Sequence, residues 1–200
     1  MNRLWLIGLL AMGISAQPAQ DAKMTATERA ELIDRLQKTE QELMQLVAGV
    51  TDAQWTFKPA PERWSIAEVV EHIVLAEAMM FDLAVRSLDR PPDPKWDATL
   101  AKTDTLRKAL PNRSRRVDAP AAIKPQQAMS RADLMARYGE QRQRALAYAR
   151  DSDRPVKAHT APNPFFGDLN AHQWLLYIPL HNERHNQQIA EVKTTPGYPR

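Results

Sequence analysis

The segment IPLHNERHNQQI, residues 178–189, carries two of the five histidines in this chain of 200 residues. An α-helix turns by about 100° per residue, so His181 and His185, four residues apart, project from one face. Trp174 and Val192 fall on or beside that face. The face is therefore predicted to be buried, where two unpaired imidazoles would be costly. The segment is either a metal-binding turn of helix or the polar part of an ordinary one.

Three further stretches show the three- and four-residue apolar spacing of a long helix. Thr27 is a candidate N-cap for the first, and Ser65 with Glu68 forms the S-x-x-E capping box of the second. A proline-containing crossover, residues 91–129, separates the second helix from the third. The four predicted helices cover residues 27–48, 65–88, 130–150 and 169–193. They predict an all-α four-helix bundle with one long crossover, preceded by a signal peptide.

The composition narrows the chemistry. Glycine is scarce, at 6 residues, and no long alternation of β-branched residues is visible, so strands are not expected. The absence of cysteine excludes disulfides, thiolate catalysis and zinc–thiolate sites. A net charge of +3 does not by itself argue for nucleic acid or an anionic membrane. The basic run RSRR, residues 113–116, is read as a solvated surface segment, with an anion-binding patch as the alternative.

The N-terminal residues follow a different pattern. Arg3 precedes an apolar stretch from Leu4 to Ile14, which is short for a membrane span, and small residues follow. This pattern predicts a secretory signal peptide over residues 1–19, cleaved after Ala16 or Ala19, and a periplasmic or secreted location. Residues 20–200 then form the mature domain. An N-terminal core helix or an uncleaved anchor is the alternative.

A third histidine would strengthen the metal interpretation. His72 is the best candidate because it lies on the inward side of the second predicted helix, although a hydrogen-bonded core histidine is the ordinary alternative. His159 falls in a loop, and His172 lies about 180° around the helix from His181. Glu183 lies about 200° from His181, so the pattern differs from H-E-x-x-H and Glu183 is not a candidate general base.

Two segments carry a resemblance to a known family. ERWSIAEVVEHIVLAE (62–77) and LLYIPLHNERHNQQIAEVK (175–193) resemble the signature segments of the DinB-like superfamily, which includes YfiT-type metal-dependent hydrolases and thiol S-transferases. NPFFG (163–167) followed by QWL (173–175) resembles a subgroup of it. The order also matches, with one histidine on an early helix and H-x-x-x-H-x-x-Q on the last. The likeness covers essentially residues 27–193.

The resemblance implies a divalent metal held by His72, His181 and His185. Neutral imidazoles suit zinc, nickel or iron(II), and three protein ligands leave coordination positions open. Gln188, one turn after His185, is a candidate to hydrogen-bond a metal-bound water or ligand, or to make a core polar contact. Trp64 and Trp174 either wall the pocket or belong to the core.

Two functions follow from these expectations. The first is an exported metal-dependent hydrolase or thiol S-transferase, whose catalytic residues the sequence does not identify. The second is a non-enzymatic periplasmic protein that binds a metal or another ligand. The expected partner is an unknown small-molecule substrate, with no nucleic acid and no membrane after signal cleavage. Homodimer formation is left open.

Overall fold

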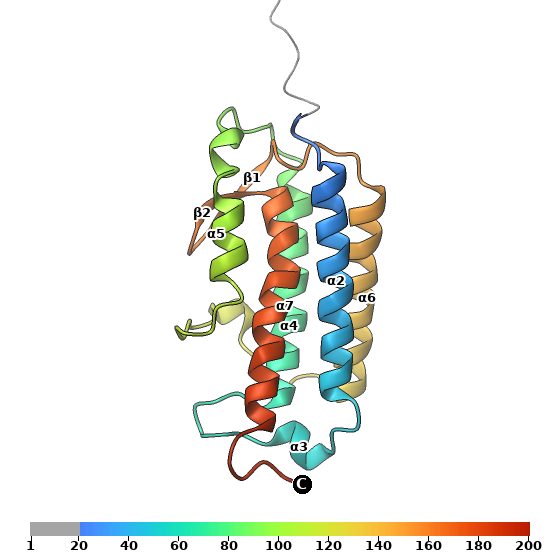
Figure 1. Cartoon of the computed structure of the whole chain (residues 1–200), viewed down its shortest axis with the longest axis vertical. Coiled ribbons are helices and arrows are strands. Elements are labelled where there is room, and N and C mark those ends of the chain that lie inside the picture. The colour runs from blue at the N-terminus through green and yellow to red at the C-terminus, as the bar shows by residue number, and fades with distance from the viewer. Residues whose placement is uncertain (1–20) are drawn as a thin grey trace, which may run out of the picture.

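The computed structural model describes residues 21–200, so the predicted signal peptide lies outside the described residues. Four long helices lie side by side as a bundle (Figure 1). They are α2 (Ala26–Val47), α4 (Ile66–Ser87), α6 (Arg131–Asp151) and α7 (Ala171–Lys193). The four predicted long helices are thereby confirmed, with bounds shifted by a few residues. Within residues 21–200, no helix is long and apolar enough to cross a bilayer.

Capping side chains set where the helices begin. The predicted box at Ser65 and Glu68 is present, with the Ser65 backbone N–H donating to the Glu68 carboxylate at 2.7 Å. The expected cap at Thr27 is wrong, because Thr25 caps α2. Thr25 and Glu28 form the same T-x-x-E box, in which each side chain accepts a hydrogen bond from the other residue's backbone N–H. Both boxes place a carboxylate at the positive end of a helix dipole.

The connecting segments contain more structure than predicted. Two short helices, α3 (Asp52–Thr56) and α5 (Lys102–Ala109), and two 3-10 turns, η1 (Trp96–Thr99) and η2 (Ala121–Ile123), lie within stretches expected to be loops. Helix α5 packs beside α7, on the side of the bundle away from α6 (Figure 1). The crossover therefore covers α7 and reaches α4 through η2.

The expectation that the chain lacks strands is also wrong. Strands β1 (Thr160–Asn163) and β2 (Gly167–Asn170) pair antiparallel, with Thr160 opposite Asn170. Each strand has only four residues, too few for an alternating pattern to be visible. The turn forms through the Asn163 side chain, whose oxygen accepts from the backbone N–H groups of Phe165 and Phe166 at 2.9 and 3.1 Å. Gly167 then takes the left-handed conformation, with φ of 65°.

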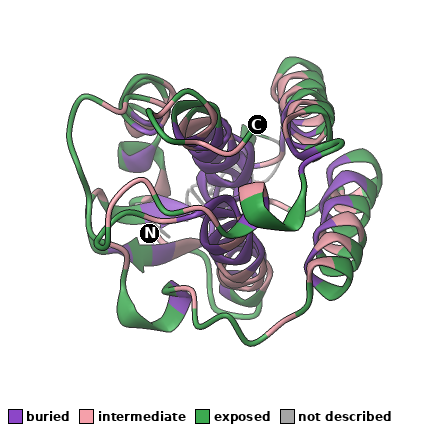
Figure 2. Cartoon of the chain, turned by 90° about the horizontal axis from the view of Figure 1, so that it is seen from below, coloured by how far each residue is buried: buried purple, intermediate pink, exposed green. Residues whose placement is uncertain are grey.

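The core consists of two apolar clusters. Seen along the bundle, buried residues face inward between the helices and exposed residues face outward (Figure 2). One cluster includes Leu36 of α2 and Leu180 of α7, and the other includes Leu43 and Ile189 of the same two helices. Between these positions α2 carries Thr39, and α7 carries the buried polar run that begins at His181. A polar layer therefore interrupts the middle of the bundle.

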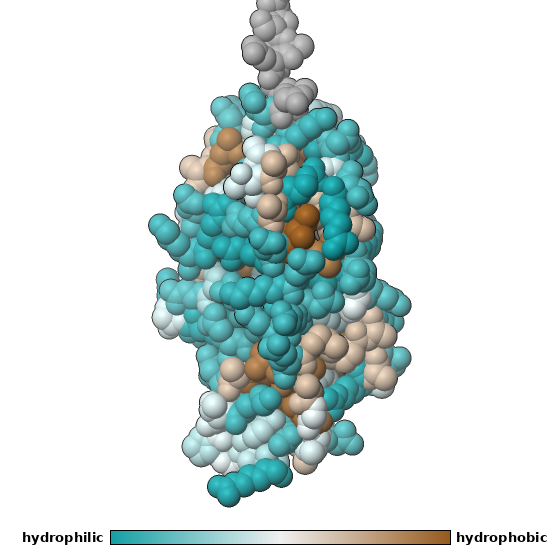
Figure 3. All heavy atoms as spheres, turned by 45° about the vertical axis from the view of Figure 1, so that its right-hand side comes forward, coloured by the Kyte–Doolittle hydropathy of each residue, from teal (hydrophilic) through white to brown (hydrophobic). Residues whose placement is uncertain are grey.

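Exposed apolar residues are scattered on the face of the molecule that Figure 3 draws. On the face drawn in Figure 3, hydrophilic residues predominate and hydrophobic residues appear in small separate groups. The exposed large hydrophobic residues of the described chain are Met44, Leu100, Val117 and Phe165.

Candidate metal centre

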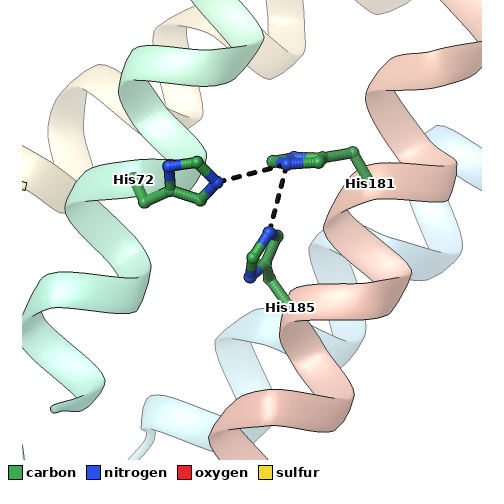
Figure 4. A group of neighbouring side chains, drawn as sticks. All are labelled: His72, His181 and His185. Atoms are coloured by element: carbon green, nitrogen blue, oxygen red, sulfur yellow. Dashed lines mark hydrogen bonds between the residues drawn. The ribbon is translucent and has the colours of Figure 1, made fainter. Parts of the chain in front are cut away.

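His72, His181 and His185 converge in the polar layer. His72 extends from α4 toward α7, which carries the other two histidines one turn apart (Figure 4). All three side chains are buried, and one ring nitrogen from each lies within 4.8 Å of the other two. The Nε2 atom of His181 is 3.2 Å from Nε2 of His72 and 3.1 Å from Nε2 of His185. The predicted spatial grouping is thereby confirmed.

The protonation of His72 follows from its other nitrogen. Nδ1 lies 2.7 Å from the backbone carbonyl oxygen of Ile123, in the 3-10 turn η2. A carbonyl oxygen can only accept, so Nδ1 must carry the proton and donate it. In the neutral ring, Nε2 then presents a lone pair toward His181. The crossover thus orients this histidine through a backbone atom.

His185 is oriented by a two-step chain of hydrogen bonds. Its Nδ1 lies 2.8 Å from Oε1 of Gln188, and the same oxygen lies 3.4 Å from Nη1 of Arg113. A guanidinium can only donate, so the Gln188 atom that faces Arg113 is the amide oxygen. Nδ1 of His185 therefore donates to Gln188, and Nε2 of His185 also presents a lone pair to the centre. Gln188 supports a candidate ligand instead of facing the centre itself.

Burial keeps these rings neutral. It lowers the pKa of His72, although the hydrogen bond to Ile123 opposes that effect. Burial also lowers the pKa of His181 and of His185 well below the ordinary histidine value. A positive charge on either neighbouring ring lowers the pKa of His181 further. At neutral pH the cluster is therefore three uncharged imidazoles, which is the form that binds metals.

The arrangement of the three nitrogens suits coordination of a divalent metal better than hydrogen bonding among the three rings. Two lone pairs point at His181, whose Nε2 can offer one proton at most, and whose Nδ1 has no hydrogen-bond partner. A metal about 2.0–2.1 Å from each nitrogen, at tetrahedral angles, would hold the nitrogens about 3.3 Å apart. The observed separations of 3.1 and 3.2 Å are close to that spacing.

A cavity of about 860 Å³ opens onto the histidines. Trp64 lies against two of them, with its ring centre 4.8 Å from that of His72 and 6.4 Å from that of His185. Trp174 also lines the cavity, and its indole N–H donates to the carbonyl of Ala161 at 3.2 Å. Both tryptophans therefore contribute to the wall, and Trp174 belongs to the core as well.

The remaining candidates lie outside the cluster. His172 is buried near Glu28 and Lys157, and His159 is buried in the segment before β1; neither belongs to the metal-ligand group found in residues 21–200. The carboxylate of Glu183 lies 3.6 Å from the guanidinium of Arg35 and does not line the cavity. The expectation that His159, His172 and Glu183 lie outside the cluster is therefore confirmed for the described residues.

Sequence reasoning missed several cavity residues. Nothing in the sequence marks the carbonyl of Ile123 as a partner for His72. Arg113 carried a signal, because it begins the RSRR run, but the preferred interpretation of a solvated segment is wrong for this residue. Its guanidinium forms two 2.6 Å hydrogen bonds with the carboxylate of Glu191 and lines the cavity. Arg115 and Arg116 are exposed but line the same cavity.

With this architecture and histidine arrangement described, comparison with known proteins identifies the class. The sequence profile of the DinB superfamily matches residues 35–189, and the chain belongs to that superfamily. The uncharacterized protein YuaE of Bacillus subtilis (strain 168) is 27% identical over 153 residues, covering 72% of this chain and 86% of YuaE.

A solved structure shares the fold. YfiT from Bacillus subtilis superposes with a TM-score of 0.53 and 18% sequence identity, covering 88% of this chain and 91% of YfiT. YfiT is described as a probable metal-dependent hydrolase with an unusual four-helix bundle topology. At this identity the likeness establishes the common fold.

Proposed function

We propose that this protein is a metal-dependent hydrolase of a small molecule, with one zinc, nickel or iron(II) ion held by His72, His181 and His185. The observation that carries the proposal is the convergence of three buried Nε2 atoms in the wall of a cavity. The description of YfiT as a probable metal-dependent hydrolase supports the same class of chemistry. A cavity of this size suits a small organic ligand.

The chain's own residues prepare the site for binding. A divalent ion with three protein ligands keeps an open position and lowers the pKa of a bound water toward neutrality. Ile123 and Gln188 fix two of the rings so that their lone pairs face inward. Trp64 covers His72 and His185, so it restricts the approach of solvent and substrate to the open side of the cavity. Such support of metal ligands typically raises affinity.

One observation favours the second candidate, a non-enzymatic protein that binds a metal or another ligand. The carboxylates that line the cavity are Glu62, Asp118 and Glu191. Glu191 is engaged by Arg113, and its pKa is lowered by that hydrogen bond, so it is a poor proton acceptor. That leaves Glu62 and Asp118 as the cavity carboxylates that could accept a proton in a hydrolase.

Turnover separates the two candidates, and also separates hydrolysis from thiol transfer. The mature protein is incubated with a panel of esters and amides, and with thiol–electrophile pairs, before and after chelation. A hydrolase loses ester or amide turnover with chelator and regains it with one metal. His72→Gln should be inactive, and His172→Gln, which alters a buried histidine outside the cluster, should remain active. Turnover that survives chelation contradicts the proposal, and thiol consumption without hydrolysis identifies a transferase.

Export is proposed on the sequence pattern of residues 1–19 alone. The mature chain should begin near Gln17 or Gln20 and appear in a periplasmic or secreted fraction. N-terminal mass analysis of the protein from its native cell tests this. Intact Met1 on a cytosolic protein contradicts it.

A further inference from the structure

The rim of the cavity carries an excess of positive charge. Six lysine or arginine side chains line the cavity, against three aspartate or glutamate side chains. One carboxylate, that of Glu191, lies close enough to three of these arginines for their charges to lower its pKa. They are Arg113, Arg63 and Arg184. Only Arg113 forms a salt bridge with it, at 2.6 Å. This group of four residues therefore has more cations than its own carboxylate can neutralise.

The basic segment is held in place over the cavity. The Arg184 guanidinium, from α7, donates to the backbone carbonyls of Asn112 and Arg115, the latter at 2.8 Å. Arg113 is fixed separately, by Glu191 and Gln188. Two arginines therefore fasten the RSRR run to the helix that carries His181 and His185. A merely solvated run of like charges would lack such attachment.

Apolar side chains lie beside this rim. Val117 and Phe165 both line the cavity, although they are 54% and 52% exposed. Deeper in, Met80 and Trp174 are buried and line it as well. Exposed apolar residues at the mouth of a cavity are typical of a ligand-binding groove. The cavity thus offers a basic edge and an apolar wall to the same ligand.

We infer that the cavity selects small molecules with an apolar part and an anionic group, a carboxylate or a phosphate. The anionic group binds at the arginine rim formed by Arg63, Arg113 and Arg115, and the apolar part lies against Val117 and Phe165. This inference names the substrate class of the proposed hydrolase and so rests on that function. Arginine suits the role because its planar guanidinium donates two parallel hydrogen bonds to a carboxylate or phosphate.

Binding to metal-free protein tests the arginine rim without the metal. Calorimetric titrations with 4-phenylbutyrate and with 4-phenylbutanamide compare two ligands of similar shape, one anionic and one neutral. The anion should bind roughly tenfold tighter at low salt, as charge-assisted hydrogen bonds are stronger than neutral ones. The preference should shrink as ionic strength rises. A third ligand, 4-phenylbutyl phosphate, distinguishes a carboxylate site from a phosphate site.

Matched variants locate the preference. Arg63→Gln and Arg113→Gln should each weaken binding of the preferred anion by roughly three- to tenfold and leave the amide nearly unchanged. Glu191→Gln should strengthen anion binding, because it removes the competing carboxylate. Arg137→Gln, an exposed arginine on α6 away from the cavity, is the control and should have no effect.

Three results overturn the inference: equal affinity for the anions and the amide, no binding of either anion at millimolar concentration, or an equal loss in Arg137→Gln. None of these three results depends on whether the protein binds a metal, because all the titrations use metal-free protein. A failure of the metal proposal shows instead as missing metal in the purified chain. The two proposals therefore fail in distinguishable ways.

Discussion

The polar layer of the bundle contains two buried groups with opposite character. In one, Arg142 of α6 lies between Glu77 of α4 and Asn182 of α7, with all three side chains almost fully buried. The other is the histidine cluster, in which His181 directly precedes Asn182 on α7. Both groups cross between α4 and α7, and both interrupt an apolar core. They differ in whether the hydrogen-bond donors and acceptors within each group are paired with one another.

The Arg142 group is nearly complete in itself. Its guanidinium donates to the Glu77 carboxylate, to Asn182 Oδ1 at 2.6 Å and to the Tyr138 hydroxyl at 3.1 Å. The one fully enclosed polar atom of this group without a partner is Nε of Arg142. Donors here face acceptors, and a cation faces an anion. The histidine cluster instead turns lone pairs toward one point. Its incompleteness, more than its polarity, marks it as a site for a ligand.

The largest effect is expected from breaking the complete group. Arg142→Met leaves the Glu77 carboxylate buried without its cation, so the free energy of unfolding should fall by about 3–5 kcal/mol. Burial already raises the pKa of Glu77 to about 7, against the influence of Arg142. Without Arg142 that pKa rises further. Urea denaturation of the metal-free protein gives the free energy of unfolding.

The pH dependence and a second variant check the cause. An acid whose folded-state pKa is raised favours folding at low pH, so the deficit of Arg142→Met should be smaller at pH 5 than at pH 8. The double variant Arg142→Met/Glu77→Leu should recover most of the loss, because the unpaired charge is gone. A single variant that loses less than about 1 kcal/mol contradicts the account.

A metal should stabilise the incomplete group. An ion that binds only the folded state, at a free concentration of 100 times its dissociation constant, adds about 2.7 kcal/mol to the free energy of unfolding. The difference between metal-loaded and chelator-treated protein measures this increment. His72→Gln, His181→Gln and His185→Gln should each lose it, and His172→Gln should retain it. An increment that persists in any of the three places the metal elsewhere.

Removing the hydrogen bond that orients His185 should weaken metal binding less than replacing His185 itself. Gln188→Ala removes the acceptor for Nδ1 and frees the ring to rotate or change tautomer, so metal affinity should fall by about 10- to 100-fold. Gln187→Ala, at the exposed neighbouring position, is the matched control. Competition with a fluorescent chelator gives both affinities. Equal affinity in the two variants shows that the hydrogen bond between Gln188 and His185 does not orient the ligand.

The smallest effect is the pH response of the metal-free cluster. Its histidines have folded-state pKa values below the ordinary 6.5, so as pH falls the unfolded chain binds protons first. Their contribution to stability is present above pH 6.5 and is lost as pH decreases below it. The urea midpoint should therefore fall less between pH 7.5 and 5.5 in His72→Gln/His185→Gln than in the unaltered protein. An equal fall in both proteins would show that the cluster is not the source.

Much of the fold and the histidine grouping is predictable, because both depend on helical periodicity. The spacing of His181 and His185 fixes their common face, and the position of His72 places it inward on the second helix. Helix starts are less certain from sequence, since two threonines two residues apart compete for one cap. Thr25 is the N-cap because Glu28 lies three residues after it and completes the capping box.

Other parts of the site depend on long-range contacts that periodicity does not encode. The Ile123 carbonyl, 51 residues from His72, is a backbone atom and leaves no mark in side-chain patterns. The pairing of Arg113 with Glu191 joins a loop to a helix 78 residues later. The hairpin before α7 is formed by one asparagine and one glycine rather than by strand propensity. The features of the cavity that the sequence did not predict therefore come mainly from the loops.

Metal content is the most direct test of the account. The unaltered protein, His72→Gln and His172→Gln are purified, exposed in turn to zinc, nickel and iron(II), dialysed, and analysed for metal by mass spectrometry. The account predicts one ion per chain in the unaltered protein and in His172→Gln, with a stoichiometric loss in His72→Gln. Absence of bound metal from the unaltered protein under all three conditions, or full occupancy in His72→Gln, would contradict it.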